Sequence, residues 1–146
     1  MSVEHLLAQQ ACRDLVLRAA ACTDAQDHEG FAELFELDGE LVRPGARVLR
    51  GREEIVASYR ARPAERITRH LVSNTLVELL TQTQARATSC VLLWSGTSTD
   101  ASGPFGRPAH GRQVVGEFDD LFTLTTAGWR IARREARFVL FKEDGE

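Results

Sequence analysis

The sequence is poor in residues that carry several common kinds of covalent catalysis. Lys142 is its only lysine and lies beyond the last alternating apolar stretch, so Schiff-base chemistry lacks a well-placed amine. Tyr59 is its only tyrosine, which limits any mechanism that needs a phenol to one place in the chain. The three cysteines, Cys12, Cys22 and Cys90, are far apart and form no CxxC pair. We expect buried free thiols rather than disulfides or a zinc site.

The chain also lacks the patterns of membrane, nucleic-acid, metal and cofactor binding. No apolar run is long enough to span a membrane, and the amino terminus shows no signal segment, so a cytoplasmic protein is expected. The net charge is -3 and the arginines are scattered, which disfavours nucleic acid and anionic membranes as partners. His5, His28 and His110 have no acidic or thiol neighbours at metal-ligand spacing, and no cofactor fingerprint is present. We expect neither metal nor cofactor.

The amino-terminal part reads as helical. With 146 residues and 43% hydrophobic content, the chain fits one domain over residues 1–146. Apolar residues at helical spacing predict a first helix from Val3 to about Cys22; they are Leu6, Leu7, Ala11, Leu15, Val16 and Ala19. Asp27 is a good N-cap for a second helix that buries Phe31, Leu34 and Phe35 and ends at Gly39.

A short strand and a third helix follow. Glu40 to Arg43 is predicted as a strand that ends at Pro44-Gly45. Gly51 opens the third helix, in which Ile55 and Tyr59 face inward, and Pro63 stops it.

After Pro63 the apolar period changes from helical to alternating. Four long strands are predicted, rich in Val, Leu, Thr and Phe: Ile67–Thr81, Ala85–Thr97, Gln113–Thr125 and Trp129–Phe141. Helices followed by strands indicate an α+β fold, most simply a cone-shaped, curved antiparallel sheet with three helices on its concave face. The Gly/Pro-rich segment 100–112 is either an ordinary connection or a flap over the mouth of a cavity.

The first long strand carries polar residues on a face that should be buried. His70, Val72, Asn74 and Leu76 would share that face, because side chains alternate along a strand. The natural partner of His70 is Asp24, just after the first helix.

The order of these motifs resembles a known family. The motifs are Asp24, the Asp27-capped helix, Asp38-Gly39-Glu40-Leu41, Gly51, Arg69-His70-Leu71-Val72-Ser73-Asn74, Gly116-Glu117-Phe118-Asp119-Asp120 and Gly128-Trp129-Arg130-Ile131. This order resembles the SnoaL-like branch of the nuclear transport factor two-like superfamily. The resemblance implies the cone-shaped fold, which hosts isomerases, dehydratases and binding proteins.

Within that superfamily, Asp24 and His70 look like the Asp-His dyad of scytalone dehydratase and hexachlorocyclohexane dehydrochlorinase. The resemblance implies that His70 removes a proton from carbon while Asp24 orients the ring. The sequence departs from this pattern at Ala19 and Thr23, and its one phenol, Tyr59, is expected to be poorly placed. An imidazole near its ordinary pKa of about 6.5 is a competent base when a carboxylate holds its other nitrogen. The alternative is a structural contact between the first helix and the sheet.

Four further residues are candidates for substrate binding. Asn74 can donate to a substrate oxygen or satisfy a strand irregularity. Trp94 can line the cavity or belong to the core. Asp120 is a candidate second acid or base, although an ion pair with Arg133 or Arg137 across the last hairpin is the simpler interpretation. Arg43 can hold a substrate anion or lie solvated at an edge.

These residues lead to two hypotheses of different kinds. The first is a cofactor-independent lyase or isomerase that acts on a small, mostly apolar cyclic substrate through Asp24 and His70. The second is a non-catalytic small-molecule binding protein, or an accessory subunit resembling the small subunit of aromatic-ring dioxygenases. Exposed apolar positions near the carboxyl end, such as Val139 and Phe141, predict a homodimer or homotrimer through the convex face of the sheet.

Overall fold

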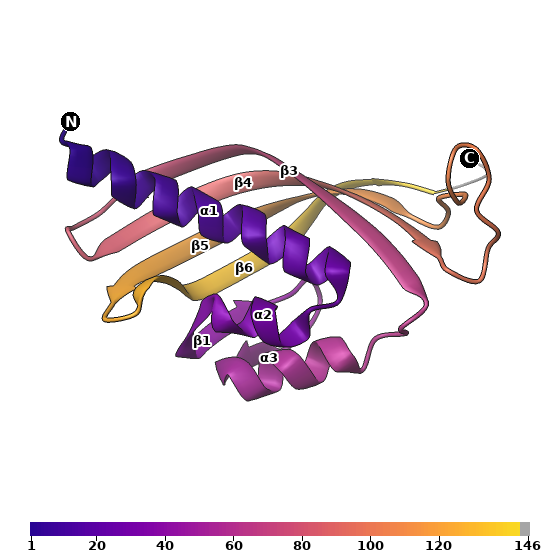
Figure 1. Ribbon diagram of the computed structural model, residues 1–146, viewed down its shortest axis with the longest axis horizontal. Coiled ribbons are helices and arrows are strands. Elements are labelled where there is room, and N and C mark those ends of the chain that lie inside the picture. Colours follow the sequence, from indigo (N-terminus) through magenta and orange to yellow (C-terminus); the bar gives the residue numbers. More distant parts are fainter. Residues whose placement is uncertain (144–146) are drawn as a thin grey trace.

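The predicted α+β class is confirmed. The structure is a computed structural model that describes residues 1–143, and in it three helices pack on a curved sheet. Figure 1 shows α1 (Val3–Ala25) lying across the sheet, with α2 (His28–Glu33) and α3 (Gly51–Arg60) below it. No helix within residues 1–143 is long and apolar enough to cross a membrane.

The sheet has six strands in the order β2-β1-β6-β5-β4-β3. Their bounds are β1 (Phe35–Val42), β2 (Val48–Arg50), β3 (Arg66–Leu79), β4 (Gln84–Thr97), β5 (Gln113–Thr125) and β6 (Gly128–Lys142). Neighbours from β3 to β6 run antiparallel as predicted, but β1 pairs with β6 in parallel. The expectation of a wholly antiparallel sheet was therefore wrong at this edge, where no hairpin joins the two strands and fixes their direction.

The second helix is shorter than predicted. Asp27 caps it as expected, accepting a hydrogen bond from the Gly30 amide at 2.9 Å. The helix ends at Glu33 rather than Gly39, and Phe35 starts β1, fully buried and in register with Ile131 of β6. Pairing with β6 thus overrides the helical spacing of these apolar residues.

The first helix packs through the middle of its length. Its buried residues are Cys12, Leu15, Val16 and Ala19, whereas Leu6 and Leu7, predicted to belong to the buried stripe, are exposed. Burial raises the pKa of the Cys12 thiol to about 12. The helix continues past Cys22 to Ala25, so Asp24 lies in its last turn.

The segment 100–112 folds back beside β3 and β4, at the end of the molecule opposite the amino terminus (Figure 1). The amide of His110 donates to the carbonyl of Ser95 at 3.0 Å, which ties the segment down. With Leu71 and Trp94, the segment forms a hollow of about 480 Å³. None of its residues lines the cavity that contains His70.

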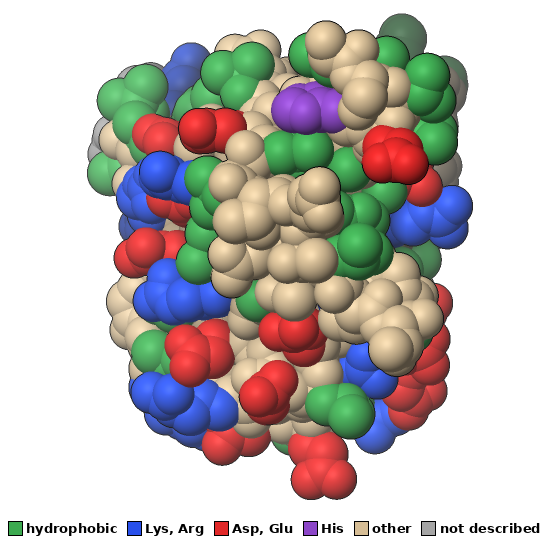
Figure 2. Space-filling view, turned by 90° about the vertical axis from the view of Figure 1, so that its left-hand side faces the viewer, with side chains coloured by type: hydrophobic (Ala, Val, Ile, Leu, Met, Phe, Trp, Pro, Cys, Tyr) green, Lys and Arg blue, Asp and Glu red, His purple; other side chains and the backbone are tan. Residues whose placement is uncertain are grey.

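The end of the molecule opposite the 100–112 segment carries the start of α1 and two hairpin turns. Figure 2 shows this end, where acidic and basic side chains are interspersed among hydrophobic ones. This face therefore has no continuous surface of one charge.

Candidate functional site

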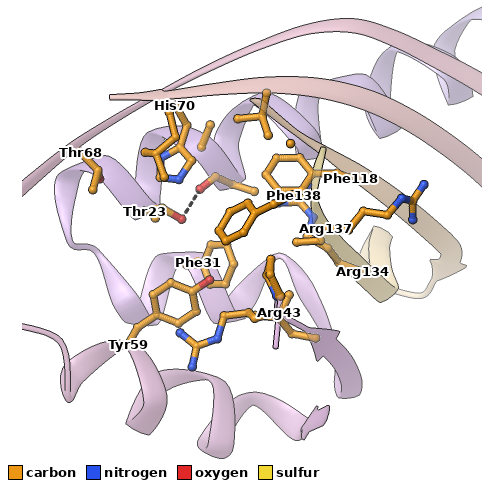
Figure 3. A pocket seen from close by; sticks show the side chains of 18 of the residues that line it. Thr23, Phe31, Arg43, Tyr59, Thr68, His70, Phe118, Arg134, Arg137 and Phe138 are labelled. Atoms are coloured by element: carbon orange, nitrogen blue, oxygen red, sulfur yellow. Dashed lines mark hydrogen bonds between the residues drawn. The ribbon is translucent and has the colours of Figure 1, made fainter. Parts of the chain in front are cut away.

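A cavity of about 120 Å³ lies between the helices and the concave face of the sheet (Figure 3). Its apolar wall comes from α1, α2 and four strands, and consists of Ala19, Ala20, Phe31, Leu41, Val91, Leu93, Phe118, Ala136 and Phe138. Its polar lining consists of Thr23, Arg43, Tyr59, Arg62, Arg66, Thr68, His70, Arg134 and Arg137. An apolar cavity of about 150 Å³ holds benzene, so this one has the size of a single small ring.

Asp24 and His70 meet at the wall of this cavity. Oδ1 of Asp24 lies 2.6 Å from Nδ1 of His70, and Oδ2 accepts the backbone N–H of the same histidine at 2.9 Å. The hydroxyl of Thr68 donates to Oδ1 at 2.9 Å. Each side chain is only 15% exposed. The carboxylate of Asp24 therefore holds both the ring and the backbone N–H of His70, in the first part of β3.

The end of α1 is held in place beside β3. Gln26 adopts a left-handed conformation (φ 57°) that ends the helix just after Asp24, and its backbone N–H donates to the carbonyls of Cys22 and Thr23. Its side chain donates to the carbonyls of Ala64 and Arg66 at 2.9 and 3.0 Å. The residue that stops the helix thus also joins it to the start of the strand that carries His70.

The hydrogen bonds favour the ionised form of Asp24. Burial raises the pKa of Asp24, but the side-chain and backbone hydrogen bonds from His70, together with the Thr68 hydroxyl, outweigh it and hold that pKa below its ordinary value. An ionised carboxylate only accepts hydrogen bonds, so Nδ1 of His70 carries the proton. In the neutral ring Nε2 then has the free lone pair, and no group in residues 1–143 donates to it. This nitrogen is available to take a proton.

A second histidine-aspartate contact lies outside the cavity. Nε2 of His110 is 2.8 Å from Asp100, both in the 100–112 segment, and their side chains are 48% and 39% exposed. Proximity to a carboxylate is therefore shared by both histidines. Only His70 combines it with an enclosed apolar chamber.

Asn74 is not on the face predicted for it. A bulge interrupts β3 between Ser73 and Leu76, and Asn74 has a left-handed backbone (φ 56°). The bulge inserts an extra residue, so the side of the strand on which later residues lie changes. Asn74 and Leu76 are exposed, while Val77 packs against the core, and Asn74 does not line the cavity.

Trp94 lies on the other side of the sheet from the cavity. It is in phase with Leu92 as predicted, but these residues occupy the exposed face, and Trp94 is 45% exposed beside the 100–112 segment. Both the cavity and the core interpretation of Trp94 were wrong. Alternation showed which residues share a face but not which face is covered by helices.

Asp120 is fully buried and pairs with Arg134, not with Arg133 or Arg137. The carboxylate oxygens accept two hydrogen bonds from the guanidinium, at 2.7 and 3.0 Å. The two-residue turn is Thr126-Ala127 and β6 carries an extra residue at 132, which together place Arg134 directly opposite Asp120. Asp120 does not itself line the cavity, although Arg134 does.

Arg43 and Tyr59 lie together at the cavity. Arg43 donates to the hydroxyl of Ser58, and its guanidinium lies 5.0 Å from the centre of the Tyr59 ring. Figure 3 shows these two side chains on one side of the cavity and His70 on the other. Tyr59 is thus not remote from the site, contrary to expectation. Its inward position four residues after Ile55 was readable, but how α3 docks was not.

Other cavity residues escaped the sequence-based prediction, among them Thr68, Arg62 and Arg134. Thr68 precedes His70 by two residues on the same strand, so the alternation that identified His70 applies to it as well. The two arginines have no comparable signal, because their positions depend on how α3 and β6 pack.

The structure thus combines a curved sheet lined by helices with a cavity that a half-buried carboxylate-imidazole pair borders. The family profile of the SnoaL-like domain matches residues 4–135. The chain belongs to the SnoaL-like family, which confirms the resemblance seen in the sequence. A comparison with curated proteins finds no match.

Solved structures with the same fold cover nearly the whole chain. A protein from Novosphingobium aromaticivorans, provisionally assigned as a scytalone dehydratase, is 20% identical, with a TM-score of 0.82 over 100% of this chain and 93% of its own. A hexachlorocyclohexane dehydrochlorinase is 14% identical, with a TM-score of 0.81 over 96% and 90%. A cystatin-like-fold protein from N. aromaticivorans is 26% identical, with a TM-score of 0.74 over 97% and 85%.

Proposed function

We propose that this protein is a cofactor-independent lyase or isomerase for a small ring compound, with His70 as the base. One observation carries the proposal: Nδ1 of His70 is held by Asp24, which leaves Nε2 for a substrate in the adjoining cavity. Family membership supports it, because the family includes dehydratase-like proteins. A buried imidazole without the carboxylate would support proton transfer less well.

The proposed reaction begins with removal of a proton from a ring carbon by Nε2. The C–H electron pair forms a new carbon-carbon double bond, and a hydroxide or halide leaves from the neighbouring carbon. The proton on His70 then passes to the departing hydroxide to give water, or to solvent when a halide leaves. In an enone no group leaves: the electron pair is delocalised into the carbonyl as an enolate, and return of the proton from His70 to another carbon gives an isomer. Asp24 stabilises the imidazolium that exists between the two steps.

A panel of hydroxylated, halogenated and enone ring compounds tests the proposal, with product formation and deuterium uptake from D₂O as readouts. Wild-type protein should turn over or exchange at least one compound, and His70→Gln should lose about 10²-fold or more of that rate. His110→Gln is the matched control, since it removes the other aspartate-linked histidine. Equal rates in wild type and His70→Gln would remove His70 from the chemistry, and ligand binding without exchange would favour a binding protein.

We also propose that the convex face of the sheet joins copies of this chain into a homodimer or homotrimer. Exposed apolar side chains form a row across four paired strands, and they are Leu71, Leu92, Val115 and Leu140. Leu71 and Leu140 are 58% and 66% exposed, which is unusual for a continuous apolar row on a monomer.

Light scattering after size-exclusion chromatography tests this assembly. Wild-type protein should have two or three times the mass of one chain. Leu140→Glu should weaken association at least about 30-fold, the effect of losing about 2 kcal/mol at a central contact. Leu37→Glu, at an equally exposed leucine on β1, should not. A wild-type mass equal to one chain refutes the assembly.

A further inference from the structure

Positive charge at the cavity is only partly neutralised by the protein itself. Arg134 is paired with Asp120, and Arg137 lies 3.4 Å from Glu117. The remaining cavity arginines form no ion pair with any carboxylate in residues 1–143, and they are Arg43, Arg62 and Arg66. The cavity end formed by α3 and the start of β3 therefore carries uncompensated charge.

Arg43 also has an unused donor. Its Nε is buried and has no hydrogen-bond partner within the described residues. A buried N–H without an acceptor is costly, and such a group calls for an explanation in a folded protein. An acceptor supplied by a ligand would satisfy it.

Arg62 lines the same cavity and contacts the same aromatic ring as Arg43. The guanidiniums of Arg62 and Arg43 lie 4.3 and 5.0 Å from the centre of the Tyr59 ring. Burial lowers the pKa of Arg62, and the positive charges of Arg43 and Arg66 lower it further, against a raising effect of Tyr59. A negatively charged ligand group would relieve this repulsion between like charges.

We propose that Arg43 and Arg62 bind a carboxylate, and that the substrate is therefore a small ring carboxylic acid. The inference rests on the proposed function for the reaction at His70 and adds the group that anchors the substrate. Guanidinium N–H groups match the two oxygens of a carboxylate in geometry and charge. Because Arg43 and His70 lie on different sides of the cavity (Figure 3), a ring held by its carboxylate at Arg43 extends toward Nε2 of His70.

A separate, narrower hollow of about 30 Å³ shares Tyr59, Arg62, Arg66 and Thr68 with the main cavity, whereas Arg43 lines the main cavity alone. The carboxylate is therefore placed in the main cavity, where both Arg43 and Arg62 are part of the lining.

Calorimetric binding of two ring compounds, benzoate and benzyl alcohol, tests the carboxylate site. Wild-type protein should bind benzoate at least about 10-fold more tightly than the alcohol, because a charged group adds charge-assisted hydrogen bonds. Arg43→Met and Arg62→Met should each remove most of this preference. Arg18→Met is the matched control with the same loss of charge, since Arg18 pairs with Asp14 on the outside of α1, and it should keep the preference.

The binding assay separates this inference from the proposed function because it needs no turnover. Equal affinity for benzoate and the alcohol, or an unchanged preference in both cavity variants, overturns the carboxylate site even if His70-dependent turnover is found. An arginine-dependent preference without any turnover upholds the site and removes the lyase. If Arg43→Met does not fold, the preference of Arg62→Met for benzoate decides the question. This variant should fold, because the Arg62 side chain makes no hydrogen bond within residues 1–143 and contacts the Tyr59 ring.

Discussion

Changing Asp24 to asparagine is expected to lower turnover by about 10²–10⁴-fold, the range for losing an effective general base. The amide can still fill the space, but its NH₂ group meets donors where the carboxylate accepts from His70 and Thr68. The ring then loses its fixed tautomer and the charge that stabilises its protonated form. Steady-state kinetics on a compound identified in the panel measures the loss.

Asp27→Asn is the matched control for this variant. Asp27 lies three residues away and caps α2 without touching His70, and asparagine caps helices about as well as aspartate. Its turnover should stay within about threefold of wild type, well below the losses expected for a general base. Equal losses in both variants would mean that the dyad is not the source of the rate.

The same Asp24→Asn variant should show a stability difference that depends on pH. The pKa of Asp24 is lowered in the fold, so its ionised form stabilises the native state above the ordinary carboxyl pKa of about 3.9. That contribution is lost as the pH falls through the lower folded pKa. The free energies of unfolding of wild type and variant should therefore differ most near neutrality and converge in acid. Urea unfolding at several pH values measures these free energies. The same difference between wild type and variant at every pH would contradict this prediction.

Breaking the pair of Asp120 and Arg134 is expected to cost the fold about 3–5 kcal/mol, as for other buried ion pairs that lose one partner. Both residues are buried, with exposures of 0% and 3%, so Asp120→Asn leaves a buried guanidinium without its counter-ion. The guanidinium of Arg134 also lies 4.0 Å from the Phe118 ring, and Arg134 and Phe118 both line the cavity. Urea unfolding measures the effect.

Two comparisons make this test specific. Replacing both partners together, by Asp120→Leu with Arg134→Met, should be less destabilising than Asp120→Asn, because no unpaired charge remains. Asp119→Asn removes the neighbouring carboxylate, which pairs with Arg86 on the exposed side at 2.9 Å, and should cost only about 0–1 kcal/mol. A similar loss of stability in Asp119→Asn and Asp120→Asn would show that burial does not increase the cost of losing one partner of the ion pair.

The fold was largely readable because its elements carry strong local patterns. The four long strands and the capped second helix follow from alternation and from Asp27. What the sequence could not show is long-range pairing: Phe35 joins β1 only because Ile131 lies opposite, and the parallel direction of β1 depends on the same contact. The extra residue at 132 is likewise invisible, because bulges have no fixed local signature here.

At the site, the contact of Asp24 with His70 was anticipated, and its catalytic role remains a proposal. Asn74 was misplaced because a strand pattern read by alternation assumes no interruption, and the bulge beside Ser73 provides one. Arg43 lines the cavity rather than lying solvated at an edge, which was one of its two interpretations, and its unpaired buried Nε is a property of packing. Charged residues contributed by several distant elements become a site only when those elements meet.

The alternation along β3 has a further consequence for how this chain can change over time. His70 and Leu71 are neighbours in sequence, yet one lines the chamber and the other lies on the outer row. Substitutions at one set of positions leave the other set in place, so the lining of the chamber can change while the outer row is kept, or the reverse. A single strand in this way serves two independent evolutionary demands.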